Sequence, residues 1–544
     1  MVLAGIKPVI ALVGRCGLER LAEVLRARGE AVAVLPGADV PALRILDPEL
    51  VYADPFDAHW ATPLGTGALA GRATEPAAAL AGPAAILDVL GTFSLVVRGV
   101  RLPPVGAFGL EGAPPPALAA VFAAAQALTR AHRTIDVAGL WARHGILDDA
   151  VRFGPGHGEA EVGPLGESRL GAGNAADVEA DAVLAWLAAR RGRAFKALVV
   201  DLDNTLVYGE IADPEFSSRN PAWCERGTTP VGDAEAAWWR APRGLHEAIR
   251  VCRGRGLALA LCTRNERAFV GRHLRIRDDR GPWGDVLRDG LLDIANFDVV
   301  EAGFGPKSAA CLRVAERLGV HPESVVFLDD SEVEREEVRV NGGGVRVLGG
   351  PVEAFRETLL TGAGFFPWTR TAVVALRPDS WRSRAAVVDA AEAGEAALEA
   401  FLLDLEIVVE LRLAAEGDEE RVVELLARTH QLRLTGVGVV APGARVYVAS
   451  CRDRLAEHGL VAVAWFVGEG RERRLVELAV SCRVLPHRIA ASVLAACLAR
   501  EPRAAVSRVD TGRNGASVGV IEEARGGVAR WVRVAWEIRA GDGA

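Results

Sequence analysis

Uninterrupted hydrophobic runs alternate with helical patterns through the middle of the chain. Three of these runs occupy residues 195–200, 257–262 and 324–328, and stretches with helical periodicity separate them. Strands that are separated from one another by helices are typical of a parallel sheet. The pattern therefore predicts an α/β domain with a parallel sheet in this part of the chain.

Polar side chains follow each hydrophobic run. Asp201 and Asp203 come after the first run, Thr263 after the second, and Asp329 and Asp330 after the third. The carboxyl ends of parallel strands lie at one edge of a sheet, so we expect these side chains to converge there. Residues two positions apart share a face of a strand, and two such carboxylates repel each other unless a cation or a phosphate offsets the repulsion.

A lysine adds a basic group to this set. The chain has only three lysines, Lys7, Lys196 and Lys307, and arginine supplies nearly all its other basic side chains. Lys307 follows Gly305 and Pro306, at the start of a helical stretch. A compact ammonium fits between a carboxylate and a phosphoryl oxygen better than a planar guanidinium does. Together these groups predict phosphoryl-transfer chemistry.

The same residues lie in four motifs that resemble those of the haloacid dehalogenase (HAD) superfamily. The motifs are Asp201-Leu-Asp-Asn-Thr, Cys262-Thr-Arg-Asn, Gly305-Pro-Lys and Asp329-Asp-Ser-Glu. This resemblance covers about residues 190–355. Residues 327–339, 428–435 and 480–485 more particularly resemble the FkbH-like glyceryl transferase/phosphatase family of polyketide pathways, within HAD subfamily IIIC.

The chemistry of the motifs and the resemblance to the superfamily suggest a role for each residue. Asp201 is the expected nucleophile and Asp203 the general acid and base. Mg²⁺ is the expected cofactor, with Asp201 and either Asp330 or Asp329 as ligands, and Glu334 is a weaker candidate beside them. The full candidate set is Asp201, Asp203, Thr263, Lys307, Cys262 and Cys482 for catalysis, Asn204, Thr263, Arg264 and Lys307 for phosphate binding, and Asp201, Asp203, Asp329 and Asp330 for the metal.

The FkbH-like resemblance implies a second reaction. Relatives take a glyceryl unit from 1,3-bisphosphoglycerate, lose phosphate, and pass the acyl group to the pantetheine thiol of an acyl carrier protein. The implied substrate is a phosphorylated three-carbon compound and the implied partner an acyl carrier protein. Cys262 and Cys482 are the candidate acyl acceptors, although each also fits as a small buried hydrophobic residue. Cys262 is favoured because its neighbour Thr263 is expected to contact the phosphate.

Two departures weaken the transferase half of this resemblance. Residues 483–488 read Arg-Val-Leu-Pro-His-Arg, where related acyltransferases have Arg-x-x-Gly-x-Gly. Proline removes a backbone donor and arginine blocks close approach of a ligand to the backbone. His430-Gln431 stands in place of an Asn-Gln pair, and His430 is either a base or a polar surface residue.

Three domains are predicted. Residues 1–175 form an N-terminal α/β domain that ends in a Gly/Pro-rich linker, residues 176–360 form a Rossmann-like HAD core, and residues 380–544 form an α/β domain like GNAT acyltransferases. A helix is expected over residues 178–191, a connector over 367–379 and a further helix over 380–402. The motif spacing leaves no room for a large cap, so the site is expected to admit bulky, including protein-bound, substrates.

The insert at residues 208–240 carries three tryptophans and several acidic residues. It is either a flap over the phosphate or a surface loop packed on the core. The tryptophans are Trp223, Trp238 and Trp239.

Composition narrows the possible functions. The formal net charge is −8, half of the residues are hydrophobic and a quarter are charged, which argues against a nucleic-acid partner. Eight cysteines without CxxC spacing argue against disulfides and zinc sites. No hydrophobic run reaches membrane length, so we expect a cytoplasmic protein without a membrane partner. Three functions remain: a bifunctional glyceryl transferase/phosphatase, a simple Mg²⁺-dependent phosphatase acting on a metabolite or protein, and a module that docks a carrier protein without transfer.

Overall fold

The computed structural model describes most of the 544 residues, and the chain divides into two compact units, residues 1–190 and 191–544. The described residues are 9–14, 18–56, 75–100, 116–143, 175–211, 242–274, 293–368, 372–429, 431–438, 440–512 and 514–536. Within these ranges no helix is both long enough and apolar enough to cross a membrane. The Gly/Pro-rich linker and most of the tryptophan-containing insert lie outside the described residues.

The first unit is built on a five-stranded parallel sheet of order β2-β1-β3-β4-β5. Its three central strands, β1, β3 and β4, are fully buried because helices cover them, whereas the edge strands β2 and β5 are only partly buried. The strands are β1 Ile10–Val13, β2 Val32–Leu35, β3 Leu50–Ala53, β4 Leu95–Arg98 and β5 Arg133–Ile135. The helices are α1 Glu19–Ala27, α2 Val40–Leu46, α4 Pro76–Leu90, α5 Pro116–Arg130, α6 Val137–Arg143 and α8 Ala175–Arg190.

The second unit opens with another five-stranded parallel sheet, of order β10-β9-β6-β7-β8. The strands are β6 Ala197–Val200, β7 Ala258–Thr263, β8 Val299–Ala302, β9 Val325–Leu328 and β10 Arg346–Val347. The helices are α11 Arg243–Gly254, α12 Arg267–His273, α14 Lys307–Leu318, α15 Glu332–Asn341 and α16 Val352–Thr361. The predicted α/β class with a parallel central sheet is confirmed.

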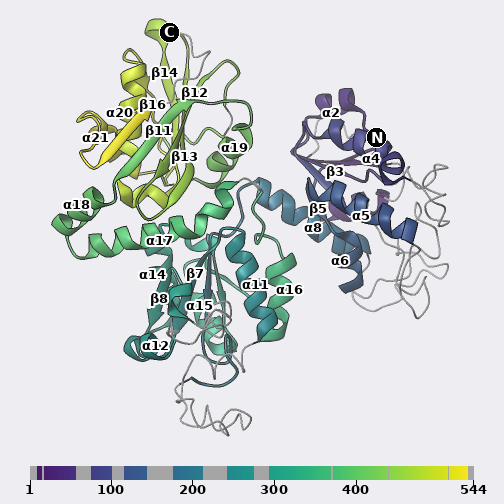
Figure 1. Cartoon of the computed structure of the whole chain (residues 1–544), viewed down its shortest axis with the longest axis horizontal. Helices are drawn as coiled ribbons and strands as arrows, with labels where there is room; N and C mark the ends of the chain where they lie inside the picture. Colours follow the sequence, from purple (N-terminus) through teal and green to yellow (C-terminus); the bar gives the residue numbers. More distant parts are fainter. Residues whose placement is uncertain are drawn as a thin grey trace. The chain divides into compact units, whose positions relative to one another are not determined.

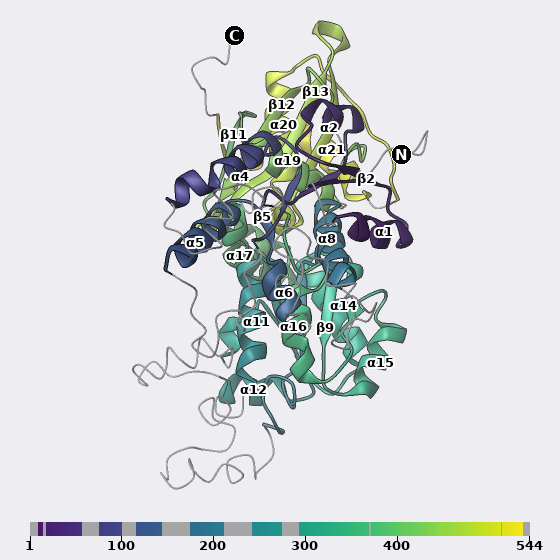
Figure 2. The same ribbon diagram turned by 90° about the vertical axis from the view of Figure 1, so that its right-hand side faces the viewer.

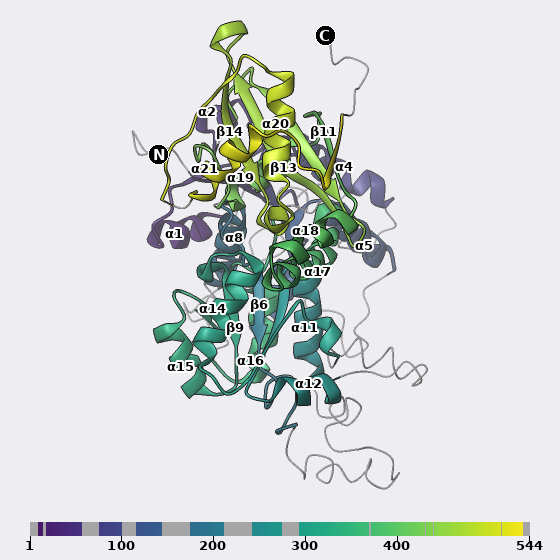
Figure 3. The same cartoon turned by 90° about the vertical axis from the view of Figure 1, so that its left-hand side faces the viewer.

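Alternate residues of these strands feed two separate hydrophobic clusters, one on each face of the sheet. Leu198 and Val200 pack with α11, α12 and α16, whereas Ala197 and Val199 pack with α14 and α15. Figure 2 and Figure 3 show α14 and α15 on one side of the sheet and α11 on the other. With both faces covered, the carboxyl edge of the sheet is left free for a site.

The rest of the second unit forms a six-stranded mixed sheet of order β15-β14-β13-β12-β11-β16. The strands are β11 Ile407–Leu413, β12 Arg445–Arg452, β13 Glu457–Val467, β14 Arg474–Val480, β15 Ala505–Val506 and β16 Val532–Trp536. The helices are α17 Ala372–Glu392, α18 Glu395–Asp404, α19 Glu419–Arg428, α20 Ala490–Arg500 and α21 Ala516–Ala524, with a short 3-10 helix, η7, over Cys482–His487. Resemblance of this part to GNAT acyltransferases stays a prediction, as do the predicted domain boundaries.

Helix α17 joins the two sheets of the second unit (Figure 1). The expected connector over residues 367–379 is wrong from residue 372 onward, where α17 begins, and Pro378 lies inside the helix. The helix tolerates this proline because Trp381 and Val387 anchor it in the hydrophobic clusters of the two sheets. The expected helix over 380–402 is instead two helices, which are interrupted at Gly394. Its φ of 116° is readily adopted by glycine but rarely by other residues.

Candidate active site at the carboxyl ends of β6, β7 and β9

One lysine and two aspartates form the centre of the site. Asp201 directly follows β6, Asp329 directly follows β9, and Lys307 is the first residue of α14. Lys307 Nζ donates hydrogen bonds to Asp201 Oδ1 at 2.6 Å and to Asp329 Oδ2 at 2.5 Å. All three side chains are buried. The parallel sheet therefore brings Asp201 together with two residues that lie more than one hundred positions further along the chain, as the motif analysis predicts.

Two carboxylates share this single ammonium, so the buried trio has an excess negative charge whenever both are ionised. Burial raises the pKa of Asp201 to about 8; Lys307 acts against this shift and Asp329 adds to it. Burial alone would lower the pKa of Lys307, but the two carboxylates raise it above its ordinary value. A further positive charge at this position would relieve the repulsion between the aspartates.

Asp203 lies beside this trio but has different partners. Asp203 Oδ1 accepts a hydrogen bond from the backbone N–H of Ile211 at 2.7 Å, and Asp203 Oδ2 accepts one from Asn265 Nδ2 at 2.6 Å. Burial raises the pKa of Asp203, although both hydrogen bonds oppose the shift. A carboxyl whose pKa is raised toward neutrality is suited to exchange protons with a reacting group.

Asn265 links Asp203 to Thr263, and sequence reasoning left it out of the candidate set. Its Nδ2 also donates to Thr263 Oγ1 at 2.9 Å, so one amide orients both side chains. Asn265 stands in the motif Cys262-Thr-Arg-Asn, and its place next to a strand end was the available signal.

The remaining candidates line the same pocket or support its wall. Asp330 pairs with Thr205, which accepts the Asp330 backbone N–H at 3.0 Å. Arg264 forms an ion pair with Glu334 at 2.6 Å. Asn204, in a left-handed conformation with φ 58°, accepts the backbone N–H of Gly209 at 2.9 Å and so closes the turn after β6.

The carboxylates of this pocket can hold a divalent ion. Asp201, Asp329 and Asp330 each offer a carboxylate oxygen, and these oxygens lie within 4.8 Å of one another. An all-oxygen donor set with excess negative charge suits Mg²⁺. The side chain of Asp203, predicted as a further metal ligand, is not part of this group; its two oxygens bond instead to Ile211 and Asn265.

The pocket has a volume of about 580 Å³ and opens to solvent. Phe304, 73 % exposed, lies on its wall. Trp223, Trp238 and Trp239 lie outside the described residues, so both alternatives for that insert, a flap or a packed surface loop, stay open.

The two candidate cysteines lie in different surroundings, and neither lines this pocket. Cys262 sits on β7 and is buried in the hydrophobic cluster that faces α14. Burial raises the pKa of its thiol to about 12, and its position next to Thr263 points the two side chains to opposite faces of the strand. The acyl-acceptor role of Cys262 stays a prediction. Burial of the thiol argues against it.

Cys482 begins η7 and lines a separate pocket together with Lys196 and several arginines. Burial alone would raise the pKa of Cys482, but Lys196, Arg384, Arg483 and Arg428 together lower it. Of the two cysteines, Cys482 is therefore the one whose surroundings favour the thiolate. His430, the other transferase candidate, lies outside the described residues.

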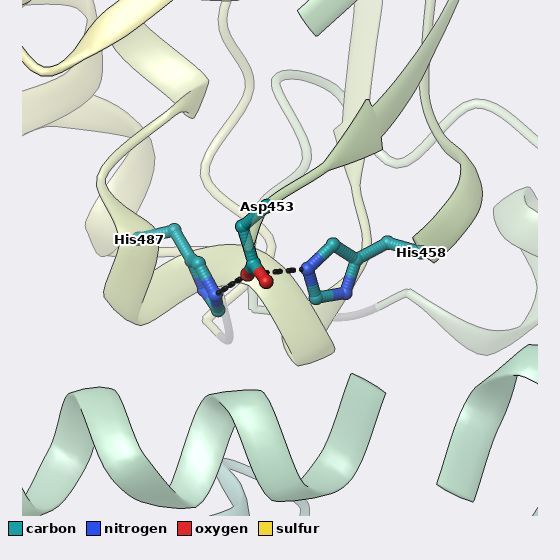
Figure 4. Close-up of side chains that lie close together, drawn as sticks. All are labelled: Asp453, His458 and His487. Atoms are coloured by element: carbon teal, nitrogen blue, oxygen red, sulfur yellow. Dashed lines mark hydrogen bonds and ion pairs between the residues drawn. The ribbon is translucent and has the colours of Figure 1, made fainter. Parts of the chain in front are cut away.

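A second polar cluster, which sequence reasoning missed, is buried in the mixed-sheet half (Figure 4). His458 Nε2 and His487 Nε2 lie 2.8 Å and 3.1 Å from Asp453 Oδ2, and Ser383 Oγ donates to the same oxygen at 2.7 Å. Burial alone would raise the pKa of Asp453, but these hydrogen bonds hold it well below its usual range. A carboxylate and two imidazoles are also ligands that zinc takes, although here each already has a partner within the cluster. No spacing rule connects these residues, so the sequence offered no signal.

Comparisons with known proteins give only distant likenesses. No protein-family model matches the chain, and no curated protein matches it. Similar solved structures include the N-terminal part of BF1531 from Bacteroides fragilis, which contains a phosphatase domain complexed with Mg (16% identity, TM-score 0.46, covering 66% of this chain and 94% of that one). Others are a HAD-superfamily hydrolase from Geobacter sulfurreducens (18%, 0.20, 30% and 99%) and the HAD domain of the effector Lem4 from Legionella pneumophila (14%, 0.21, 31% and 95%).

Proposed function

We propose that the Asp201 site is a Mg²⁺-dependent phosphatase site of the HAD type. The observation that carries this proposal is the buried trio in which Lys307 bonds to both Asp201 and Asp329. Two carboxylates at one sheet edge, a lysine between them and an adjacent proton-exchanging carboxyl are the groups that an aspartyl-phosphate mechanism requires.

In the proposed reaction, an oxygen of Asp201 attacks phosphorus. An O–P bond forms to Asp201 as the bond to the leaving oxygen breaks, and Asp203 gives its proton to that oxygen. Asp203 then takes a proton from a water molecule, and the oxygen of that water attacks phosphorus. A new O–P bond forms as the bond to Asp201 breaks, and phosphate is released. Lys307 offsets the charge on the phosphoryl group, and Mg²⁺ held by Asp201 with Asp330 or Asp329 would supply further neutralisation.

The finer proposal is glyceryl transfer, with a phosphoglycerate-type acyl phosphate as donor and an acyl carrier protein as final acceptor. It draws on the FkbH-like motifs and on the reactive surroundings of Cys482. Here Cys482, rather than Cys262, is the enzyme thiol that carries the acyl group. Polyketide-type biosynthesis and a cytoplasmic location belong to the same proposal.

A simple phosphatase is the second candidate, and residues 483–488 favour it because they lack the glycines of related acyltransferases. One reaction separates the two. The protein is incubated with 1,3-bisphosphoglycerate and an acyl carrier protein, with and without chelator, while released phosphate and the intact masses of both proteins are followed.

We expect Mg²⁺-dependent phosphate release and a carrier protein heavier by one glyceryl unit. Phosphate release without any acyl adduct would support the simple phosphatase. Full phosphate release in excess chelator by a Cys482→Ala protein, which lacks the thiol route, would refute the metal-dependent mechanism. A carrier that binds without phosphate release or an adduct would point to the docking module.

A further inference from the structure

The pocket that contains Cys482 lies at the opposite end of the parallel sheet from the Asp201 site. Lys196, which lines this pocket, directly precedes β6, whereas Asp201 directly follows it. At about 3.3 Å per residue, the two backbone positions are about 16 Å apart. Helices α17 and α19 and the start of η7 supply the rest of the wall.

Positive charge dominates this pocket. Five cationic side chains line it, and Glu424 is the carboxylate that the described structure pairs with them, through Arg377, Arg421 and Arg428. One carboxylate does not balance this set, even with Cys482 ionised. The lining cations are Lys196, Arg377, Arg421, Arg428 and Arg483.

Arg483 has no ion pair among the described residues, and Arg377 uses only one of its terminal nitrogens to bond to Glu424. Both terminal nitrogens of Arg483, and Nη1 of Arg377, are buried and have no hydrogen-bond partner among the described residues. Arg483 and Arg377 are only 3 % and 4 % exposed. A buried, unpaired charge is costly, and arginine does not shed its proton to avoid the cost. Binding of an anion in this pocket would therefore be favourable.

We propose that this pocket is a second ligand site, which binds the phosphate group of a small phosphorylated ligand through Arg483 and Arg377 and places that ligand beside Cys482. Arginine suits phosphate because its planar fork donates two parallel hydrogen bonds. The cavity has a volume of about 40 Å³, against about 580 Å³ for the Asp201 pocket, so it admits the phosphate group, and the rest of the ligand would extend toward the opening.

Because the two sites are far apart, acyl transfer to Cys482 requires the substrate to bind in this pocket. This part of the inference rests on the proposed transferase function. A three-carbon acyl phosphate held at Asp201 does not reach across β6 to Cys482. The thiol therefore needs a phosphate-binding site of its own. There the Cys482 thiolate attacks the acyl carbon, a C–S bond forms as the C–O bond to phosphate breaks, and phosphate leaves with the bonding electrons.

The groups that face Cys482 also set its ionisation. They are Lys196 before β6, Arg377 and Arg384 on α17, Arg421, Glu424 and Arg428 on α19, and Arg483 in η7. Burial alone would raise the pKa of the thiol, but the cations lower it. A bound phosphate would cancel part of this effect, so the pH at which Cys482 becomes reactive should rise when the ligand binds.

Alkylation of Cys482 tests the proposal directly. Its rate with iodoacetamide is measured by peptide mass spectrometry, with 3-phosphoglycerate, free 4′-phosphopantetheine or glycerate added at one ionic strength. At ten times its Kd a ligand leaves about one tenth of the sites free, so we expect alkylation to slow about tenfold. Protection by 3-phosphoglycerate identifies a small phosphorylated acid, and protection by phosphopantetheine alone identifies the carrier arm. Equal rates with all three compounds would overturn the proposal.

Variants place the effect on the arginines. Arg483→Gln and, independently, Arg377→Gln should abolish the protection, whereas Arg488→Gln, which removes a partly exposed arginine paired with Glu395, should keep it. Protection that persists in both buried variants would contradict the assignment. The Asp201→Asn protein should still show protection, so failure of this anion site is distinguishable from failure of the phosphatase, which appears only in phosphate release.

Discussion

At the scale of single residues, the arrangement at Asp201 favours reactivity over stability. Lys307 neutralises only one of the two carboxylates that it contacts, and burial raises the pKa of Asp201 to about 8. The ionised form of Asp201 is therefore held in the folded state at a cost, as is common for groups in active sites. A substitution that removes its charge should harm the reaction but not the fold.

We therefore expect Asp201→Asn to abolish the aspartyl-phosphate without lowering the free energy of unfolding. Asp203→Asn should slow turnover by about 10²–10⁴-fold, the usual contribution of a general acid or base. The measurements are phosphate release from an aryl phosphate and urea denaturation of each variant. Asp379→Asn, at an exposed position on α17, is the matched control. Normal turnover in the Asp201→Asn variant would show that Asp201 is not the nucleophile.

The sequence predicted the residues of this trio because each stands directly after a strand or at a helix start. It did not predict the arginine pocket, whose members come from four distant segments. Lysine usage did contain a signal: Lys196, like Lys307, is one of only three lysines in the chain. In the structure Lys196 Nζ donates to the backbone carbonyl of Arg428 at 2.8 Å, beside Cys482.

At the scale of elements, α17 is held on one side by the buried Asp453 cluster. Ser383 on α17 donates to Asp453, and Ser380 on the same helix contacts His458 Nδ1 at 2.7 Å. The other oxygen of Asp453 accepts the backbone N–H groups of Leu455 and Ala456, each at 2.7 Å. The carboxylate thus fixes the turn between β12 and β13 and ties it to the helix.

Asp453→Asn should weaken this connection, because an amide would turn a donor toward groups that already donate. Breaking a buried charged interaction typically costs about 3–5 kcal/mol, and we expect a loss of that order in the free energy of unfolding. Urea denaturation monitored by tryptophan fluorescence measures it. Asp379→Asn again serves as control, with an expected change within about 0.5 kcal/mol. A similar small change for Asp453→Asn would show that the cluster does not stabilise the fold.

Sequence patterns predicted an element well where its own hydrophobic residues determine its structure. They predicted it poorly where packing against two neighbouring sheets determines its structure. β6, β7 and β9 lie where the hydrophobic runs end in polar residues. The start of α17 fell within the expected connector over residues 367–379. Pro378 is unfavourable inside a helix, but Trp381, buried against the parallel sheet, holds the helix in place. Local propensity is a weak prior when packing on two sides overrides it.

At the scale of the molecule, the parallel-sheet and mixed-sheet halves belong to one compact unit, although the sequence suggests two domains. Trp381 of α17 lies in the hydrophobic cluster of the parallel sheet, and its Nε1 donates to the Gly256 carbonyl at 3.3 Å. Arg384, one turn further on, donates to the carbonyls of both Arg317 and Cys482. The helix therefore completes the core that holds Asp201 and at the same time positions the thiol pocket.

This arrangement predicts where the chain can be divided. A fragment of residues 191–544 should unfold in one transition and keep Mg²⁺-dependent phosphate release, because it retains α17 and both sheets. A fragment of residues 191–361 lacks α17 and leaves the cluster around Trp381 uncovered, so it should aggregate or lose its thermal transition. Within the longer fragment, Trp381→Ala should cost about 3–5 kcal/mol, the usual loss for a buried tryptophan. Differential scanning calorimetry compares the three proteins, and a shorter fragment that melts at the same temperature as the longer one would show that the parallel-sheet domain is complete without the helix.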